Sequence, residues 1–230
     1  MQPYGNDIYT EPDADPHALA NLGPLAPMAG TWESTRGDNI HPIGPGSDRE
    51  GGTVEDGGLR VAYVEHYDLQ PIDPQTNGPQ LFYGLRYHVH IVKPGEVETF
   101  HDQVGYWLWE PATHTVSHTL AIPRGQVAFA AGIAEPDAKE FEVTASAGAA
   151  YYGILSNPFL ETAFQTLSFR IRITVHDDGT WSYEEDTVMQ LPDRDEPFHH
   201  IDRNTMALVA PPSPNPLLAA EASGRSVGAR

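Results

Sequence analysis

The sequence predicts an all-β protein, and three observations support that class. Many short segments are rich in β-branched and aromatic residues and are separated by turn-forming residues. Only one segment, residues 158–165, has the pattern of a helix. The alternation of strands and helices that indicates a parallel α/β sheet does not occur. Many short strands with turns between them are typical of a β-sandwich or a β-barrel, and composition does not distinguish the two.

The clearest strands form a predicted hairpin near the C-terminus. Apolar and polar residues alternate from residue 167 to 175, which is the pattern of a strand with one buried face. A turn follows at Asp177-Asp178-Gly179, and the alternation resumes at 181–189. Glu185 lies on the apolar face of this second strand, where a carboxylate is unexpected. Similar patterns predict strands at residues 59–69, 80–92, 100–109, 115–122, 126–131, 140–145 and 198–209.

Length and composition predict one domain with extensions at both ends. The chain has 230 residues, 40% of them hydrophobic, which is enough for one substantial core. We expect an N-terminal extension at 1–21, a barrel or sandwich domain at 22–209 and a flexible tail at 210–230, because both ends are rich in proline and in polar or small residues. The polar, glycine-rich stretch 37–58 is long for a connection, so we expect it to form a lid over one end of the fold.

Composition also excludes several functions. The absence of cysteine excludes disulfides, thiolate-bound zinc, iron–sulfur clusters and a cysteine nucleophile. A net charge of -19 disfavours binding to nucleic acid or to anionic membranes. No apolar run reaches the length of a bilayer and no signal peptide begins the sequence, so we expect a cytoplasmic protein without a membrane partner. Motifs of serine hydrolases, phosphate-binding loops and dinucleotide-binding folds are absent.

Two motifs, one near each end of the predicted domain, resemble those of the nitrobindin family. The first is Gly30-Thr31-Trp32, preceded by a Leu-Gly-Pro-Leu segment, and the second is His200-Ile201 in the last predicted strand. Nitrobindins are haem-binding antiparallel β-barrels of about ten strands, similar in shape to fatty-acid-binding proteins and lipocalins. The resemblance therefore implies a single antiparallel β-barrel of about ten strands, with one short helix, over residues 22–209.

The resemblance also implies a cofactor and the residues that bind it. Family members hold a ferric haem, here expected to be haem b, through one histidine of the last strand. They are proposed to bind nitric oxide and to isomerise peroxynitrite to nitrate. The family histidine is followed directly by an apolar residue, which matches His200 and makes it the predicted metal ligand. Gly30, Thr31 and Trp32 are the other predicted cofactor-binding residues, and no residue is assigned a catalytic role.

Two questions about these motifs stay open: which of two adjacent histidines points inward, and how two substituted glycines affect ligand binding. Adjacent residues of a strand point to opposite faces, so only one of His199 and His200 points inward, and the pattern around them fits either choice. In the first strand, Ser34 and Arg36 replace two glycines of the family pattern. These side chains either obstruct a flat ligand or, for Arg36, pair with a propionate.

Two other functions remain open from the sequence. A barrel of this kind can bind an apolar small molecule, such as a fatty acid, without chemistry. Alternatively, His88 and His90, with Glu96, Glu98 and His101 downstream, are similar to the divalent-metal motif inside cupin barrels. Apolar residues occupy the alternate positions, however, and if these face the interior then both histidines face outward. The sequence leaves both a monomer and a homodimer open.

Overall fold

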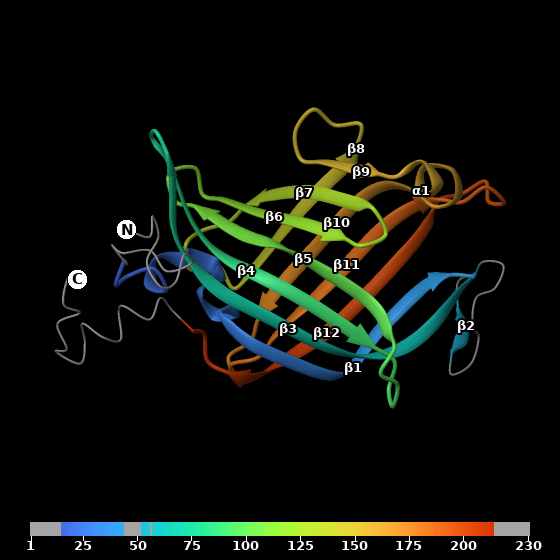
Figure 1. Cartoon of the computed structure of the whole chain (residues 1–230), viewed down its shortest axis with the longest axis horizontal. Helices are drawn as coiled ribbons and strands as arrows, with labels where there is room; N and C mark the ends of the chain where they lie inside the picture. The colour runs from blue at the N-terminus through green and yellow to red at the C-terminus, as the bar shows by residue number, and fades with distance from the viewer. Residues whose placement is uncertain (1–14, 44–51, 56, 214–230) are drawn as a thin grey trace, which may run out of the picture.

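The computed structural model describes residues 15–43, 52–55 and 57–213. A single sheet curls into a closed barrel, with strands in the order β1-β12-β11-β10-β8-β9-β7-β6-β5-β4-β3-β2 (Figure 1). Pairing of β1 with β3 closes the ring, β2 extends β3 outside it, and β9 lies between β7 and β8. The pairs are antiparallel except β8 with β9, which is parallel. The predicted all-β barrel of about ten strands is confirmed.

Most predicted strands agree with the observed bounds to within about two residues, but the strand predicted at 59–69 continues to Asn77, and the strands at 53–55 and 153–156 were not predicted. The elements are η1 (Ala20–Met28), β1 (Gly30–Pro42), β2 (Thr53–Glu55), β3 (Gly58–Asn77), β4 (Gln80–Val92), β5 (Thr99–Glu110), β6 (Thr115–Ile122), β7 (Gln126–Ile133), β8 (Glu140–Ala147), β9 (Gly153–Ser156), α1 (Pro158–Ala163), β10 (Gln165–Val175), β11 (Trp181–Gln190) and β12 (Phe198–Ala210). The predicted helix is α1, which begins after Asn157, whose side chain accepts hydrogen bonds from two backbone N–H groups. No helix in the described part of the chain is long and apolar enough to cross a bilayer.

The stretch 37–58 differs from the prediction of one polar connection. Strand β1 continues to Pro42, and β3 begins at Gly58. A register shift between Ser34 and Gly37 interrupts the alternation of buried and exposed residues. Because of this interruption, the sequence does not show the regular alternation by which a strand is predicted. Residues 44–51 and 56 lie outside the described residues, and so do most of the predicted extension and tail; the predictions of a lid and of flexible ends therefore stay predictions.

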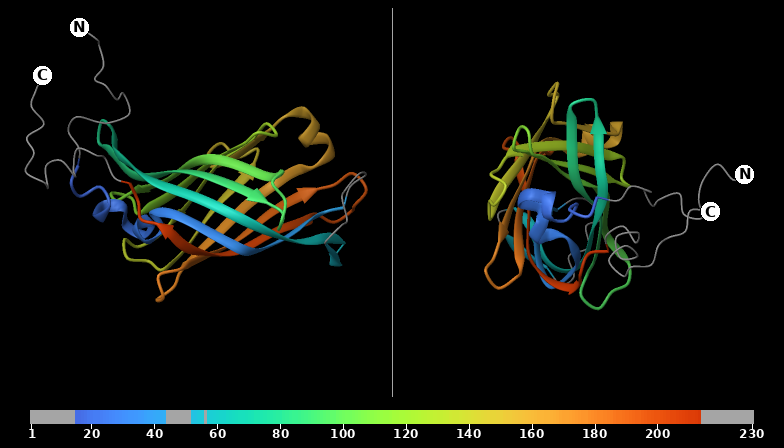
Figure 2. Two further views of the ribbon diagram at one scale, coloured as in Figure 1. Left: turned by 60° about the horizontal axis from the view of Figure 1, so that its bottom comes forward. Right: turned by 90° about the vertical axis from the view of Figure 1, so that its left-hand side faces the viewer.

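One end of the barrel is filled by aromatic and aliphatic side chains. The segment η1 lies across this end (Figure 2) and buries Leu22, Leu25 and Met28. Trp109 is also buried there, and its ring lies so close to Gly23 that a Cβ at Gly23 would come within 2.5 Å of it. Gly23 has a φ of 57°, which favours glycine. This end of the barrel is therefore a packed core.

Candidate functional site

The opposite end of the barrel, beside α1, contains a cavity of about 670 Å³. Its volume lies in the range of about 300–1,000 Å³ that is typical of small-molecule sites. The walls come from the last part of β1, from α1 and from most strands of the ring. Its ionisable lining residues are His41, Glu65, Lys93, His101, Asp102, His118, Arg124, Glu185, His200 and Asp202. Apolar side chains such as Ile91, Phe100 and Ile171 complete the walls, so the cavity combines an apolar surface with several imidazoles.

Strand β12 brings His200 to this cavity and turns His199 away from it. The His200 side chain lines the cavity and is 29% exposed. The His199 side chain is 60% exposed and lies 3.0 Å from a carboxylate oxygen of Asp186. Phe198, on the same face as His200, is buried. Of the two adjacent histidines, His200 is the one whose ring faces the interior.

The side chain of Asn39 lies between two cavity imidazoles and fixes the protonation of both. Its Nδ2 donates to Asp202 Oδ1 at 2.6 Å and lies 2.7 Å from His200 Nε2. Because an amide nitrogen only donates, His200 Nε2 is the acceptor and carries a lone pair. Asn39 Oδ1 only accepts, so Nδ1–H of His41 donates to it at 2.7 Å and leaves the lone pair of His41 on Nε2. A lone pair on a neutral imidazole is what a metal ligand requires.

His118, at the inner wall of the cavity, has a nitrogen without a partner. Its ring stacks on Trp107, with centroids 4.0 Å apart, and its Nε2 lies 2.8 Å from the Tyr87 hydroxyl. That hydroxyl donates to Thr119 O and accepts from Gln103 Nε2, so His118 Nε2 is the donor and Nδ1 carries the lone pair. Nδ1 is buried with no hydrogen-bond partner. Burial lowers the pKa of His118 to about 3, so this ring is neutral at neutral pH.

The other two cavity imidazoles are also held neutral. Burial, and secondarily the neighbouring His200, lowers the pKa of His41. Burial likewise lowers the pKa of His101, with the Asp202 carboxylate acting in the opposite direction. Together with His200, these imidazoles form a donor set that suits a transition-metal centre rather than Mg²⁺ or Ca²⁺.

Two carboxyl groups, the buried Glu65 and the partly buried Glu185, lie in the cavity wall. Glu65 Oε2 accepts hydrogen bonds from the Tyr183 hydroxyl at 2.8 Å and from Asn204 Nδ2 at 2.6 Å. Burial raises the pKa of Glu65 to about 7. Burial, reinforced by the charges of Asp202 and Glu65, raises the pKa of Glu185 well above its usual value. The protonated form of Glu185, a residue that is unexpected in its strand pattern, is therefore favoured relative to an exposed carboxyl.

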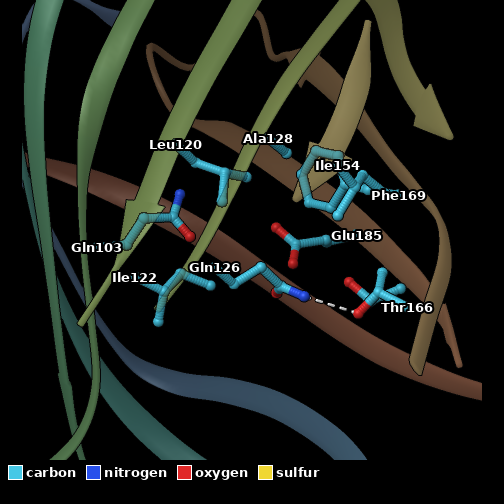
Figure 3. A pocket seen from close by; sticks show the side chains of 10 residues that line it. Gln103, Leu120, Ile122, Gln126, Ala128, Ile154, Thr166, Phe169 and Glu185 are labelled. Atoms are coloured by element: carbon cyan, nitrogen blue, oxygen red, sulfur yellow. Dashed lines mark hydrogen bonds between the residues drawn. The ribbon is translucent and has the colours of Figure 1, made fainter. Parts of the chain in front are cut away.

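The Glu185 carboxyl also faces a small side chamber of about 30 Å³ (Figure 3). Gln103, Gln126 and Thr166 surround it with polar atoms, and Gln126 Nε2 donates to Thr166 Oγ1 at 2.8 Å. Leu120 and Phe169 supply apolar surface. A polar chamber of this volume has room for about two water molecules. The Glu185 carboxyl therefore borders a space that is large enough for water.

The three residues of the first-strand motif lie away from the cavity. Trp32 is buried in the packed end, where its Nε1 donates to Met28 O at 2.8 Å and its ring meets Trp181 edge-on. Thr31 Oγ1 donates to Asp68 Oδ1 at 2.8 Å. Gly30 allows a close approach to the last strand, since a Cβ there would lie 2.8 Å from Ala210 O. The structure therefore does not bring these residues together with His200, and their role as cofactor-binding residues stays a prediction.

The two residues that replace family glycines do not line the cavity either. Arg36 is exposed, and its backbone N–H donates to Ser34 Oγ at 3.3 Å. Neither side chain is part of the cavity wall, so neither obstructs a ligand there. Positive charge at the cavity comes instead from Lys93 and Arg124.

The cupin-like interpretation of His88 and His90 is wrong for the barrel interior. Both side chains point outward, because Tyr87, Val89 and Ile91 occupy the buried alternate positions of β4. His101 lies inside the barrel on β5, so the residues of the proposed motif are divided between two faces of the wall. Neither Glu96 nor Glu98 belongs to the histidine–carboxylate group that His88 and His90 form with Asp102.

Several cavity residues were not singled out from the sequence. His118 alternates with Val116 and Leu120, and Glu65 alternates with Tyr63 and Tyr67, so each interrupts an apolar face as Glu185 does. The sequence could therefore have indicated His118 and Glu65 as candidate site residues, because each is a polar residue on an otherwise apolar strand face. Asn39 and His41 had no such signal, since they follow the register shift in β1.

Comparison with known proteins places this geometry in context. The family model of the THAP4-like, heme-binding β-barrel domain matches residues 21–207. Among solved structures, the crystal structure of Rv2717c from M. tuberculosis superposes with a TM-score of 0.53 at 19% identity, covering 85% of this chain and 99% of that one. At this identity the likeness concerns the fold alone. No curated protein matches the chain.

Proposed function

Because the chain belongs to the THAP4-like, haem-binding β-barrel domain family, we propose that its cavity binds haem b and that His200 is the iron ligand. The observation that carries this proposal is the lone pair of His200 Nε2 at the wall of a cavity of about 670 Å³. Apolar walls suit the porphyrin, and Lys93 and Arg124 offer positive charge to its propionates. The residues present therefore fit a haem group.

Residues around His200 would orient its imidazole for iron binding. Asn39 and Asp202 hold the ring from one side, and ligation through Nε2 would replace the hydrogen bond from the Asn39 amide. A bound haem supplies an iron centre for binding nitric oxide and for converting peroxynitrite to nitrate, which are the activities we propose. The protein contributes a partly closed site, and the raised pKa of Glu185 favours the protonated carboxyl that can donate a hydrogen bond to an anion in the cavity.

Reconstitution of the purified chain with haemin tests the proposal. We expect one haem per chain with a Soret band, and we expect His200→Ala to lose this band or to weaken haem binding at least tenfold. His199→Ala is the matched control, because it removes the adjacent imidazole that points outward, and it should retain the wild-type spectrum. Loss of the band in His41→Ala or His118→Ala with retention in His200→Ala would show that another cavity imidazole binds the iron.

The alternative function, transport of an apolar molecule, gives a different result in the same experiment. It predicts colourless protein that takes up no haemin but binds a fluorescent fatty acid. The imidazole of His200 at the cavity wall favours the haem proposal, because an apolar ligand has no use for a metal-binding nitrogen.

A further inference from the structure

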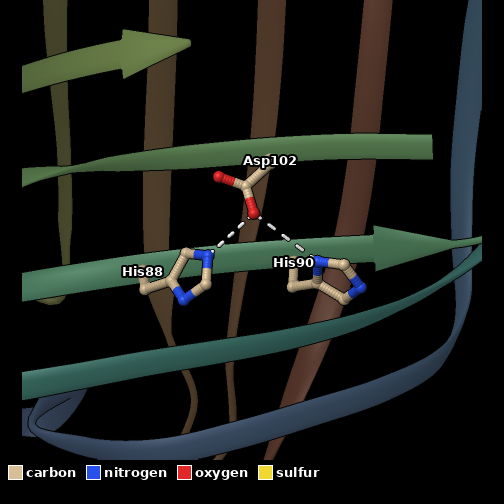
Figure 4. A group of neighbouring side chains, drawn as sticks. All are labelled: His88, His90 and Asp102. Atoms are coloured by element: carbon tan, nitrogen blue, oxygen red, sulfur yellow. Dashed lines mark hydrogen bonds and ion pairs between the residues drawn. The ribbon is translucent and has the colours of Figure 1, made fainter. Parts of the chain in front are cut away.

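A second group of histidines lies on the outer face of the barrel wall. His88 and His90 are two residues apart on β4, so their side chains project on the same face. Asp102 on β5 is the direct cross-strand partner of His90. Figure 4 shows the three side chains converging above the two strands. Their side chains are 51%, 39% and 32% exposed, respectively, so an ion in solution can reach them.

The spacing of the polar atoms suits a single metal ion. Asp102 Oδ2 lies 2.9 Å from His88 Nε2 and 3.5 Å from His90 Nδ1. One ligand atom from each residue lies within 4.8 Å of both others. Zinc–nitrogen bonds of about 2.0–2.1 Å place neighbouring tetrahedral ligand atoms roughly 3.4 Å apart. Small rotations of two exposed imidazoles therefore bring all three atoms to coordination distance.

We propose that His88, His90 and Asp102 form a binding site for a divalent transition metal of the zinc class on the outside of the barrel. Two imidazoles and one carboxylate favour Zn²⁺, Co²⁺, Ni²⁺ or Cu²⁺ over Mg²⁺ and Ca²⁺, which prefer oxygen ligands. Three protein ligands leave the remaining positions to water. The site is separate from the haem site proposed above, because His88 and His90 face outward and are not part of the cavity wall, which Asp102 alone of the three also borders.

The strands hold the ligands of this site at a defined spacing. Its ligands lie on two adjacent, hydrogen-bonded strands, so the backbone holds their spacing. The pair of His66 and Glu33, 3.2 Å apart, and the pair of His199 and Asp186 each offer only two ligands. A third ligand distinguishes the proposed site from both. A bound ion would link β4 to β5 directly beside His101, which faces the cavity from the same strand as Asp102.

Titration of the haem-free full-length chain with Zn²⁺, followed by calorimetry, tests the site. We expect a site of one ion per chain whose affinity falls at least tenfold in His88→Ala and in Asp102→Asn. His199→Ala, which removes an exposed imidazole paired with a carboxylate, should leave this affinity unchanged. Because all three positions are at the surface, thermal melting of each variant without metal should match that of the wild type.

The cavity imidazoles require a separate readout, since they can also bind zinc. In NMR spectra, substoichiometric Cu²⁺ should broaden the ring signals of His88 and His90 before those of His200. Zinc affinity that is unchanged in His88→Ala, or that is lost only in His200→Ala, would overturn the proposal. The haem test is independent of this outcome, because His88→Ala should retain the Soret band.

Discussion

The two ends of the barrel interior are filled by different kinds of side chain. At the η1 end, Trp32, Trp109 and Trp181 pack among aliphatic residues. At the α1 end, imidazoles and carboxyls surround the large cavity. The same ring of strands builds both ends, so the difference lies in the side chains that project inward. Apolar packing at one end can stabilise the fold, while the other end carries polar groups that cost stability but can bind a ligand.

The largest effect of a substitution is expected in the packed end. Trp181 is fully buried and contacts the rings of Trp32, Tyr67 and Tyr183. Truncation in Trp181→Ala leaves a void among these rings, and we expect the free energy of unfolding to fall by about 3–5 kcal/mol. Urea denaturation followed by circular dichroism measures this change. A loss below about 1 kcal/mol would mean that the packed end does not dominate the stability of the barrel.

A smaller, pH-dependent effect is expected from Glu65, a carboxyl of the cavity end. Its folded pKa of about 7 lies above the ordinary value of 4.5, so the native state binds the proton more tightly than the unfolded state. This group therefore makes the protein less stable as pH rises from about 4.5 to 7, by roughly 3 kcal/mol in total. In Glu65→Gln, which keeps an acceptor for Tyr183 and Asn204, this decrease should disappear. Urea denaturation at pH 5 and pH 8 compares the two proteins.

His118 provides the control of opposite sign for that experiment. Its folded pKa of about 3 lies below the ordinary value of 6.5, so its contribution is fully present above pH 6.5 and is lost as pH falls toward 3. Replacement by phenylalanine removes this loss, and the variant should gain stability relative to wild type at pH 5. If Glu65→Gln and His118→Phe change the pH dependence in the same direction, burial does not govern the titration of these groups.

The smallest effect is expected for an aromatic residue at the cavity mouth. Phe164 ends α1, is partly buried and lines the cavity, so one side of its ring already faces open space. We expect Phe164→Ala to lower the free energy of unfolding by only about 1 kcal/mol, because few packing contacts are lost. The same denaturation measurement applies. A loss as large as that in Trp181→Ala would contradict the division between the two ends.

The sequence predicts local features of this fold better than it predicts the cavity. The alternation in β10 and β11 depends on residues next to each other in the chain, and these strands were predicted almost to their ends. The choice between His199 and His200 depends on how β12 pairs with β1 and β11, which no short pattern contains.

Two residues illustrate the same limit for the candidate sites. Glu185 was visible as a carboxylate on an apolar face, but its raised pKa depends on burial by the folded barrel and on the charges of Asp202 and Glu65 from other strands. Asp102 meets His90 only because the register of β4 and β5 places them opposite each other. Alternation in the sequence indicated that His88 and His90 point outward. Only the pairing of the strands in the structure identified Asp102 as the third ligand.

Strand β1 has neighbours from opposite ends of the chain: Thr31 pairs with Asp68 on one side and with Ala210 on the other. During synthesis on the ribosome, Asp68 emerges well before Ala210, because all the strands from β4 to β11 lie between them in the sequence. Contacts between such distant segments slow folding. Until β12 docks, β1 has an exposed edge prone to pairing with other chains, and the wall that carries His200 is missing. Nascent chains of this protein should therefore depend on chaperones until their last strand is made.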